Sequence, residues 1–180
     1  VRTFQKTSVF GGRSALDNIL IGLHLRSVQE PLAILLGLPS IAREEKKLAA
    51  EARRILEFVG LAARADELGA ALPYGEQRRL EIARALVHDP ANIVLDEPTN
   101  GLDVLATRAL RESLRRLRDE QGKCIVFSTH IMQEVERLCD EVVVMAHGRT
   151  VAHGSVPELL ARTGRDVFEQ AFIDLAFTPA

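Results

Sequence analysis

Asn92-Ile93-Val94-Leu95-Asp96-Glu97-Pro98-Thr99 reads as a short apolar strand that ends in two adjacent carboxylates. The carboxyl ends of strands form the edge at which α/β sheets bind their ligands. Helices and strands alternate around this stretch, from Pro73 onward, and this alternation predicts a parallel α/β sheet. We therefore expect Asp96 and Glu97 to lie at the functional edge of that sheet.

The two carboxylates can perform different tasks. Asp96 can hold Mg²⁺ through water, because Mg²⁺ takes few carboxylates from a protein. Glu97 points the other way along the strand and can orient and deprotonate a water molecule. Holding the metal and activating water are the carboxylate tasks of phosphoryl transfer. The alternative is a strand that ends in an acidic turn without a chemical role.

The hydrophobic pattern places the elements around this stretch. The predicted strands cover residues 92–95, 124–127, 141–145 and 150–152, and the first two are expected to be buried. The predicted helices are one with the stripe Leu80, Ala83 and Val87, one with Leu105, Leu110, Leu114 and Leu117, and one over residues 131–138. A last helix begins at Ser155, whose spacing to Glu158 is that of a capping box.

Residues 13–72 have a different character, because they are rich in Ala, Leu, Glu and Arg and are expected to be helical. The apolar residues that share one helix face are Leu48, Ala52, Ile55, Leu56 and Val59. Gly60 is expected to end that helix. Residues 1–12 are interpreted as the end of a strand followed by a loop.

Two further elements strengthen the functional interpretation. His130 follows the strand at 124–127 and is expected beside Asp96 and Glu97, where it can donate to a phosphate oxygen. The stretch Leu72-Pro73-Tyr74-Gly75-Glu76-Gln77-Arg78-Arg79 opens the helix before the carboxylate strand. Gly75 exposes backbone N–H groups at the positive end of the helix dipole, which is a phosphate site. A structural histidine and a simple helix cap are the alternatives.

Composition limits the class of partner. The 23 basic and 25 acidic residues are well mixed, and Trp is absent, so we expect no nucleic-acid partner. The longest apolar run, residues 31–41, is far shorter than the roughly 20 residues that span a bilayer. The start of the chain lacks the pattern of a secretory signal. Cys124 and Cys139 lack metal-ligand spacing and are expected to be reduced thiols in the core of a cytosolic protein.

Together these motifs resemble the nucleotide-binding domains of ABC transporters. Residues 72–77 are similar to the signature motif, residues 92–97 to the Walker B strand and residues 100–103 to the D-loop. His130 is similar to the switch histidine, and Gln5 to the Q-loop glutamine. The resemblance covers nearly the whole chain.

The two halves of the chain resemble different branches of that family. Arg2-Thr3-Phe4-Gln5 and Leu72-Pro73-Tyr74-Gly75 look most like importers of branched-chain amino acids. Residues 99–177 look more like export-type subunits, including the sodium-export group.

The resemblance implies a RecA-like P-loop NTPase core with an inserted α-helical subdomain. The core would take residues 1–5 and 76–155, the helical subdomain residues 6–75, and a C-terminal helical extension residues 156–180. It implies ATP and Mg²⁺ as cofactors. The implied partners are a second ATP-binding subunit and transmembrane permease subunits, at the cytoplasmic face of the membrane.

The resemblance also implies a role for each matched residue. Glu97 and His130 would be catalytic, and Asp96 and Gln5 would hold the metal. The residues that would contact nucleotide are Gln5, Gly75, Glu76 and Asp103. In such dimers the signature and the D-loop act on the site of the partner chain.

The chain departs from the family pattern at two places. The phosphate loop, G-x-x-x-x-G-K-[ST], is absent from the sequence, and the only Gly-Lys pair, Gly122-Lys123, is followed by Cys. We therefore expect a fragment or partial gene product that is inactive alone, although its parent protein would be an ATPase. In the signature, Pro73 replaces the usual Ser and Tyr74 replaces a Gly, so a hydroxyl and an N–H donor are lost.

The function expected from these residues is ATP hydrolysis that powers transmembrane transport, most simply amino acid import. Export is one alternative, and a non-catalytic piece that docks or dimerises without turnover is another. An ABC ATPase of DNA repair or translation is disfavoured, because those proteins carry two cassettes or long coiled-coil insertions.

Overall fold

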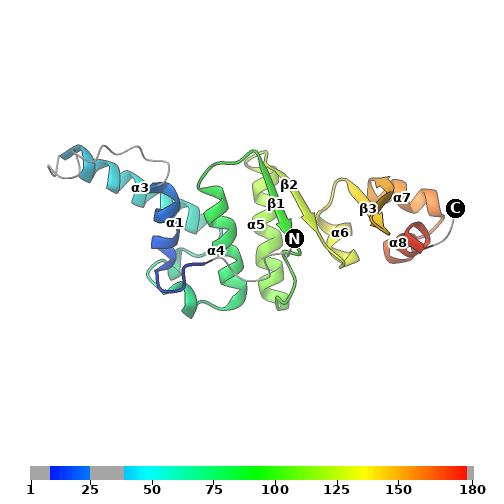
Figure 1. Ribbon diagram of the computed structural model, residues 1–180, viewed down its shortest axis with the longest axis horizontal. Coiled ribbons are helices and arrows are strands. Elements are labelled where there is room, and N and C mark those ends of the chain that lie inside the picture. Colours follow the sequence, from blue (N-terminus) through cyan, green and yellow to red (C-terminus); the bar gives the residue numbers. More distant parts are fainter. Residues whose placement is uncertain (1–8, 25–38, 178–180) are drawn as a thin grey trace. The chain divides into compact units, whose positions relative to one another are not determined.

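The computed structural model describes residues 9–24 and 39–177. The chain divides into two compact units, residues 1–127 and residues 128–180. Among the described residues, no helix is both long and apolar enough to cross a bilayer. The elements, labelled in Figure 1, are α1 (Ala15–His24), α3 (Pro39–Phe58), the 3-10 turns η1 (Ala62–Arg64) and η2 (Gly69–Ala71), α4 (Tyr74–Leu86), β1 (Asn92–Asp96), α5 (Val104–Asp119), β2 (Cys124–Ser128), α6 (Met132–Leu138), β3 (Val142–Ala146), β4 (Arg149–Gly154), α7 (Val156–Thr163) and α8 (Phe168–Phe177).

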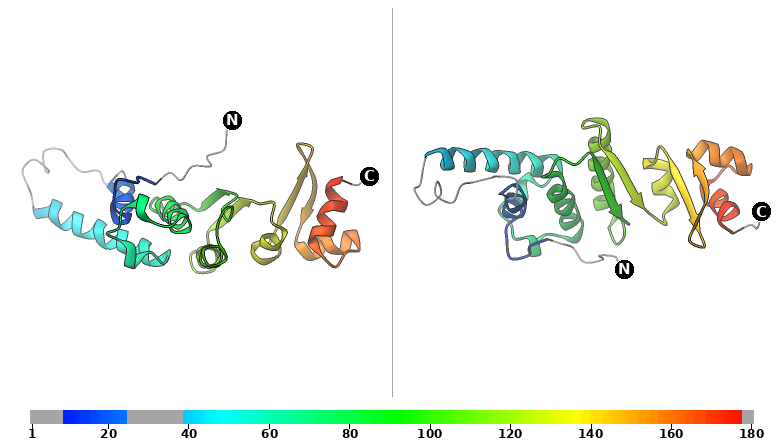
Figure 2. Two further views of the ribbon diagram at one scale, coloured as in Figure 1. Left: turned by 90° about the horizontal axis from the view of Figure 1, so that it is seen from below. Right: turned by 45° about the horizontal axis from the view of Figure 1, so that its top comes forward.

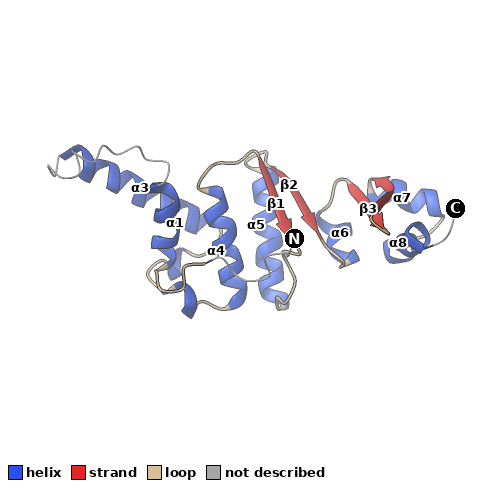
Figure 3. Cartoon of the chain, in the orientation of Figure 1, coloured by secondary structure: helices blue, strands red, loops and turns tan. Residues whose placement is uncertain are grey.

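Helices α1, α3 and α4, blue in Figure 3, belong to the first unit. They pack around one apolar core. The residues of α3 and its end that are buried there are Leu48, Ala52, Leu56 and Val59, whereas Ile55 is half-buried. The chain leaves α3 at Gly60, which has a φ of +71°. The predicted apolar face and the predicted end of this helix are therefore confirmed.

Two arginines hold the carboxyl end of α3. Arg79 of α4 donates to the carbonyl oxygen of Val59 at 3.0 Å. Arg116 of α5 donates to the carbonyl oxygen of Phe58 at 3.0 Å, and its guanidinium lies 4.3 Å from the centre of the Phe58 ring. The last carbonyl groups of a helix need partners from outside it, and here these partners come from α4 and α5.

The segment before α1 is tied to the segment before α4. The buried Asn18 side chain accepts a hydrogen bond from the Phe10 N–H group at 2.8 Å and donates to the Phe10 carbonyl at 3.1 Å. The N–H group of Gly69 donates to the Arg13 carbonyl at 2.8 Å, and that of Ala70 to the Gly11 carbonyl at 3.1 Å. These bonds fix the path of the chain into α4.

Strands β1 and β2 form a two-stranded sheet, and α5 is the crossover between them. Figure 1 shows the two arrows pointing the same way, and both views of Figure 2 show the strands side by side. The residues of α5 that are buried are Leu110, Ser113, Leu114 and Leu117. Most of the predicted stripe is thus confirmed, but Leu105, in the first turn of the helix, is 77% exposed.

The prediction that both strands are buried is wrong. Ile93 of β1 is buried, but Val94 is 77% exposed, and Val126 of β2 is 56% exposed. Cys124 is also exposed, so it is not the core thiol that the sequence suggested. Strands of a parallel sheet are buried only when both faces are covered. Within the described residues of the first unit, one face of β1 and β2 has no such cover.

The second unit contains the predicted hairpin. β3 and β4 pair antiparallel, from Val142 opposite Gly154 to Ala146 opposite Arg149. The turn uses His147 and Gly148, both with positive φ. The residues that form the core against α7 and α8 include Val144, Leu159, Phe168 and Ala171.

Helix α7 begins with the predicted capping box. The Glu158 carboxylate accepts hydrogen bonds from the N–H group of Ser155 at 2.8 Å and from its hydroxyl at 2.9 Å. These bonds to the N-cap residue hold the pKa of Glu158 below its usual range.

Candidate functional site

The carboxylate pair lies where β1 ends. Asp96 is the last residue of the strand and is exposed, and Glu97 is half-buried in the turn that follows. Glu97 has a φ of +42°, in the left-handed region that non-glycine residues seldom adopt. Backbone strain of this kind costs about 1–3 kcal/mol and persists where neighbouring groups enforce it.

Asn100 is the neighbour that enforces the position of Glu97. Its side-chain amide donates to Glu97 Oε2 at 2.9 Å. Its backbone N–H group donates to the Glu97 carbonyl oxygen at 3.1 Å. This role of Asn100 was not predicted from the sequence, although an Asn within a tight turn is a recognisable signal for such local bonds. One carboxylate oxygen of Glu97 is thus oriented by the turn itself.

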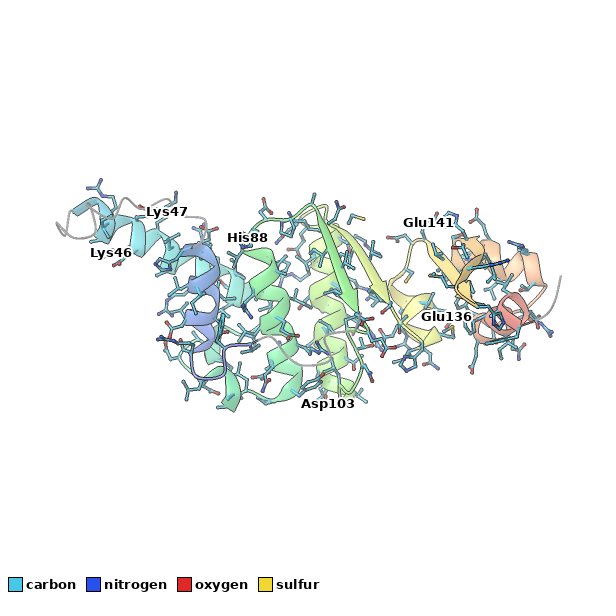
Figure 4. The ribbon with its side chains drawn as sticks, viewed as in Figure 1. Lys46, Lys47, His88, Asp103, Glu136 and Glu141 are labelled. Carbon is cyan, nitrogen blue, oxygen red and sulfur yellow. The ribbon has the colours of Figure 1, made fainter. Side chains whose placement is uncertain are left out.

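The turn continues into α5. The N–H group of Leu102 donates to the carbonyl oxygen of Thr99 at 3.2 Å. Asp103 is the N-cap residue of α5, and its carboxylate accepts a hydrogen bond from the Ala106 N–H group at 2.7 Å. Figure 4 labels Asp103 at this end of the helix. The structure gives Asp103 a capping role, and its contact with nucleotide remains a prediction.

The start of α4 presents backbone donors. The Pro73 carbonyl oxygen accepts hydrogen bonds from the N–H groups of Glu76 at 2.9 Å and Gln77 at 3.0 Å. The N–H groups of Tyr74 and Gly75 precede these bonds, and the first N–H groups of a helix have no partner within it. This arrangement is compatible with the expected phosphate site.

Gly75 also has a packing role. A Cβ atom at Gly75 would lie 2.4 Å from the Cβ atom of Ala106. Only glycine therefore allows α4 and α5 to approach this closely at their amino ends. The structure thus brings the signature stretch and the D-loop turn of the same chain together.

Glu76 lies between two arginines. Its carboxylate oxygens are 3.5 Å from Nε of Arg64 and 3.8 Å from a terminal guanidinium nitrogen of Arg79. The Glu76 side chain is 21% exposed. These ion pairs connect α4 with η1, and a contact between Glu76 and nucleotide remains a prediction.

His130 and Gln5 are the other two predicted site residues. His130 is exposed and belongs to the second unit, whereas Asp96 and Glu97 belong to the first. The approach of His130 to the carboxylates therefore stays a prediction. Gln5 lies outside the described residues.

The carboxylates suit a metal that binds few protein groups. Among the residues that the structure describes, no three His, Cys, Asp or Glu side chains gather into a metal-binding group. Mg²⁺ in phosphoryl-transfer sites needs only one or two carboxylates, because water and phosphate oxygens complete its shell. Asp96, exposed at the end of β1, fits that requirement.

A strand that ends in paired carboxylates, a helix that joins it to its neighbour and a preceding helix that begins at Tyr74 fit the core of a RecA-like P-loop NTPase. The family model described as "ABC transporter" matches residues 2–100, which is more than half of the chain. The chain belongs to the ABC transporter family of ATP-binding proteins.

Some of the relatives to which the chain is similar are named as import proteins, and others are named as export proteins. It is 47% identical over 116 residues to a Nod factor export ATP-binding protein I of Ralstonia nicotianae, covering 64% of this chain and 36% of the relative. It is 34% identical to a methionine import ATP-binding protein of Streptomyces griseus, covering 94% and 43%. It is 33% identical to the high-affinity branched-chain amino acid transport protein LivG of Escherichia coli, covering 88% and 62%. The matched part of the chain thus spans between about a third and three fifths of the length of these relatives.

Solved structures support the fold. An ATP-binding cassette of an ABC transporter, MJ1267 in its ADP conformation, matches with a TM-score of 0.68 and 27% identity, covering 91% of this chain and 63% of that one. The cassette MJ0796, a dimer bound to ADP and phosphate, matches with a TM-score of 0.66 and 23% identity, covering 84% and 60%. The second likeness shows the fold alone.

Proposed function

We propose that this chain belongs to an ATP-hydrolysing subunit that powers transmembrane transport. The observation that carries the proposal is the Glu97 carboxylate, held by Asn100 at the end of β1 beside Asp96. A carboxylate oriented in this way can bind a water molecule and accept its proton. The membership of the family supplies the context in which that water attacks ATP.

The proposed roles follow from the position of each residue. Asp96 holds Mg²⁺, which when bound supplies positive charge against the β- and γ-phosphate oxygens. Glu97 orients water and takes its proton, and His130 donates to a γ-phosphate oxygen. Gln5 joins Asp96 at the metal.

The opposite half of each site comes from a second subunit. Gly75 and Glu76, at the start of α4, and Asp103, at the start of α5, act on the nucleotide of the partner chain. The division into a core of residues 1–5 and 76–155, a helical subdomain of residues 6–75 and an extension of residues 156–180 belongs to the same proposal. Transmembrane permease subunits dock at the cytoplasmic face of the membrane.

The proposed cargo is an amino acid taken into the cell. LivG, a branched-chain amino acid transport protein, matches 88% of this chain, and a methionine import protein matches 94%. Export is the second candidate, because the Nod factor export relative has the higher identity, 47%. Uptake of labelled branched-chain amino acids by cells with and without the gene distinguishes import from export. Loss of an importer lowers the uptake, whereas loss of an exporter leaves the uptake unchanged.

The test of ATP hydrolysis uses Glu97→Gln in a chain extended upstream to include a phosphate loop. The amide keeps the shape of the side chain but cannot accept a proton, so ATP binding should persist while turnover falls by at least about 100-fold. Phosphate release and nucleotide binding are measured together, and Glu112→Gln, on the exposed surface of α5, is the matched control. If the Glu97 variant turns over within about twofold of the parent, the role of general base belongs to another residue.

A further inference from the structure

We propose that Tyr74 is a positioning residue that connects the start of α4 to the turn that holds Glu97. This inference rests on the proposed function, because it assigns Tyr74 to the supporting structure of the same site. It concerns a contact within one chain, between the helix that opens on Gly75 and the turn over residues 97–102.

The first contact is between Tyr74 and the turn. A Cβ atom at Gly101 would lie 3.5 Å from Cε1 of Tyr74, so the ring lies beside Gly101. Gly101 has a φ of +74°, and it directly follows Asn100. Asn100 donates to the Glu97 carboxylate at 2.9 Å. The Tyr74 ring therefore lies beside Gly101, and Asn100, the residue before Gly101, bonds to Glu97, the proposed general base.

A second set of contacts, made by Arg78 of α4, restrains the Tyr74 ring. Nε of Arg78 donates to the Tyr74 hydroxyl at 3.1 Å, and the guanidinium carbon of Arg78 lies 5.5 Å from the ring centre. Arg78 in turn pairs with the Glu81 carboxylate at 2.9 Å. Both side chains of this ion pair are largely buried, at 17% and 16% exposed. A pair that is screened from water in this way restricts the rotamers of Arg78 and hence of the ring.

The arrangement forms a continuous support from Glu81 through Arg78 and Tyr74 to the turn. Within the turn, the N–H groups of Asn100 and Leu102 donate to the carbonyl oxygens of Glu97 at 3.1 Å and Thr99 at 3.2 Å, beside the side-chain bond of Asn100 to Glu97 at 2.9 Å. Tyr74 itself is 41% exposed, so its burial contributes little to the core and its value lies in position. Movement at the start of α4 would reach Glu97 by this route.

The experiment measures hydrogen exchange of the Asn100 and Leu102 amides in the chain as it stands. Tyr74→Leu removes the ring and should raise their exchange rates about tenfold, because local opening of the turn becomes easier. Tyr74→Phe keeps the ring and should stay within about threefold of the parent. Phe10→Leu is the matched control, because Phe10 also lies beneath an arginine of α4, with Arg84 4.6 Å from its ring centre.

Further outcomes decide the inference. If the Leu80 and Ala83 amides of α4 keep their protection in Tyr74→Leu and the turn amides do not change, the inference is overturned. If α4 itself loosens, Arg78→Met provides the same test, since it frees the ring without altering Tyr74. In an active chain that includes a phosphate loop, Tyr74→Leu should lower kcat about tenfold with little change in KM. Faster exchange with unchanged kcat would overturn the link to Glu97, whereas an inactive parent chain would contradict only the proposed ATPase function.

Discussion

At the scale of single residues, the site depends on how the turn after β1 restrains Glu97. The positive φ of Glu97 and its two bonds with Asn100 belong to one local structure. In the proposed function, the side chain of Asn100 would therefore support catalysis by orienting Glu97, without touching the reacting atoms.

Replacement of Asn100 by Ala should weaken the catalytic step. The Glu97 carboxylate would lose the amide that orients it, and we expect kcat to fall by about 10- to 100-fold with KM nearly unchanged. Steady-state phosphate release in a chain that includes a phosphate loop measures this effect. Asn92→Ala, at the other end of β1, is the control, and equal losses in the two variants would argue against the orienting role.

The two cysteines should differ in reactivity. Burial raises the pKa of Cys139 to about 11, and Asp140 and Glu134 add to the rise. Cys124 is exposed. Because the thiolate is the reactive form, only about one Cys139 in a thousand is reactive at pH 8. A disulfide reagent should modify Cys124 quickly. The rate of modification of Cys139 should rise about tenfold per pH unit toward pH 11. Cys124→Ser should remove the fast phase, and a fast phase that survives this change would contradict the assignment.

At the scale of elements, the amino ends of α4 and α5 approach each other closely. Gly75 and Ala106 set that approach, because a Cβ atom on Gly75 would overlap that of Ala106 at 2.4 Å. Gly75 thus has a role in the packing of α4 against α5, in addition to its proposed role in ligand binding at the start of α4.

Gly75→Ala should therefore lower the free energy of unfolding by about 1–3 kcal/mol, as overpacked sites do. Urea denaturation measures the change. Gly12→Ala is the control, because no atom lies within 4 Å of its added Cβ. Adding Ala106→Gly should recover part of the loss. If the losses of the two single variants simply add in the double variant, the two helices do not clash at this point.

The elements themselves could largely be predicted from the sequence, because each carries its own periodicity. The apolar face of α3, the hairpin of β3 and β4 and the capping box of α7 depend on neighbours within a few residues. The bond between Asn100 and Glu97 required the actual turn geometry. The burial of β1 was predicted wrongly, because burial depends on what covers the sheet. The sequence of an apolar strand is the same whether one face of the sheet is covered or both.

At the scale of the whole molecule, the chain of 180 residues has the carboxylates but not the loop that binds phosphate. Such a loop supplies a Lys and backbone N–H groups that offset the charge of the triphosphate. Without it, Asp96 and Glu97 present two negative charges to a polyanion.

We therefore expect this chain alone to bind ATP with Mg²⁺ more weakly than about 1 mM, and to hydrolyse it negligibly. Calorimetric titration and phosphate release measure the two quantities. Mixed with an intact ABC ATP-binding subunit, it should complete at most one site, in which the intact subunit's loop faces Gly75 of this chain. Micromolar affinity or clear turnover by the chain alone would mean that another segment holds the phosphates.

The open face of β1 and β2 also affects how the protein behaves in solution. Val94 and Val126 expose apolar surface on a strand pair, and such surfaces attract one another and apolar dyes. Salting-out ions strengthen this attraction. Preparations of these 180 residues should therefore lose solubility as ammonium sulfate or protein concentration rises, and a charged residue in place of Val94 should delay precipitation.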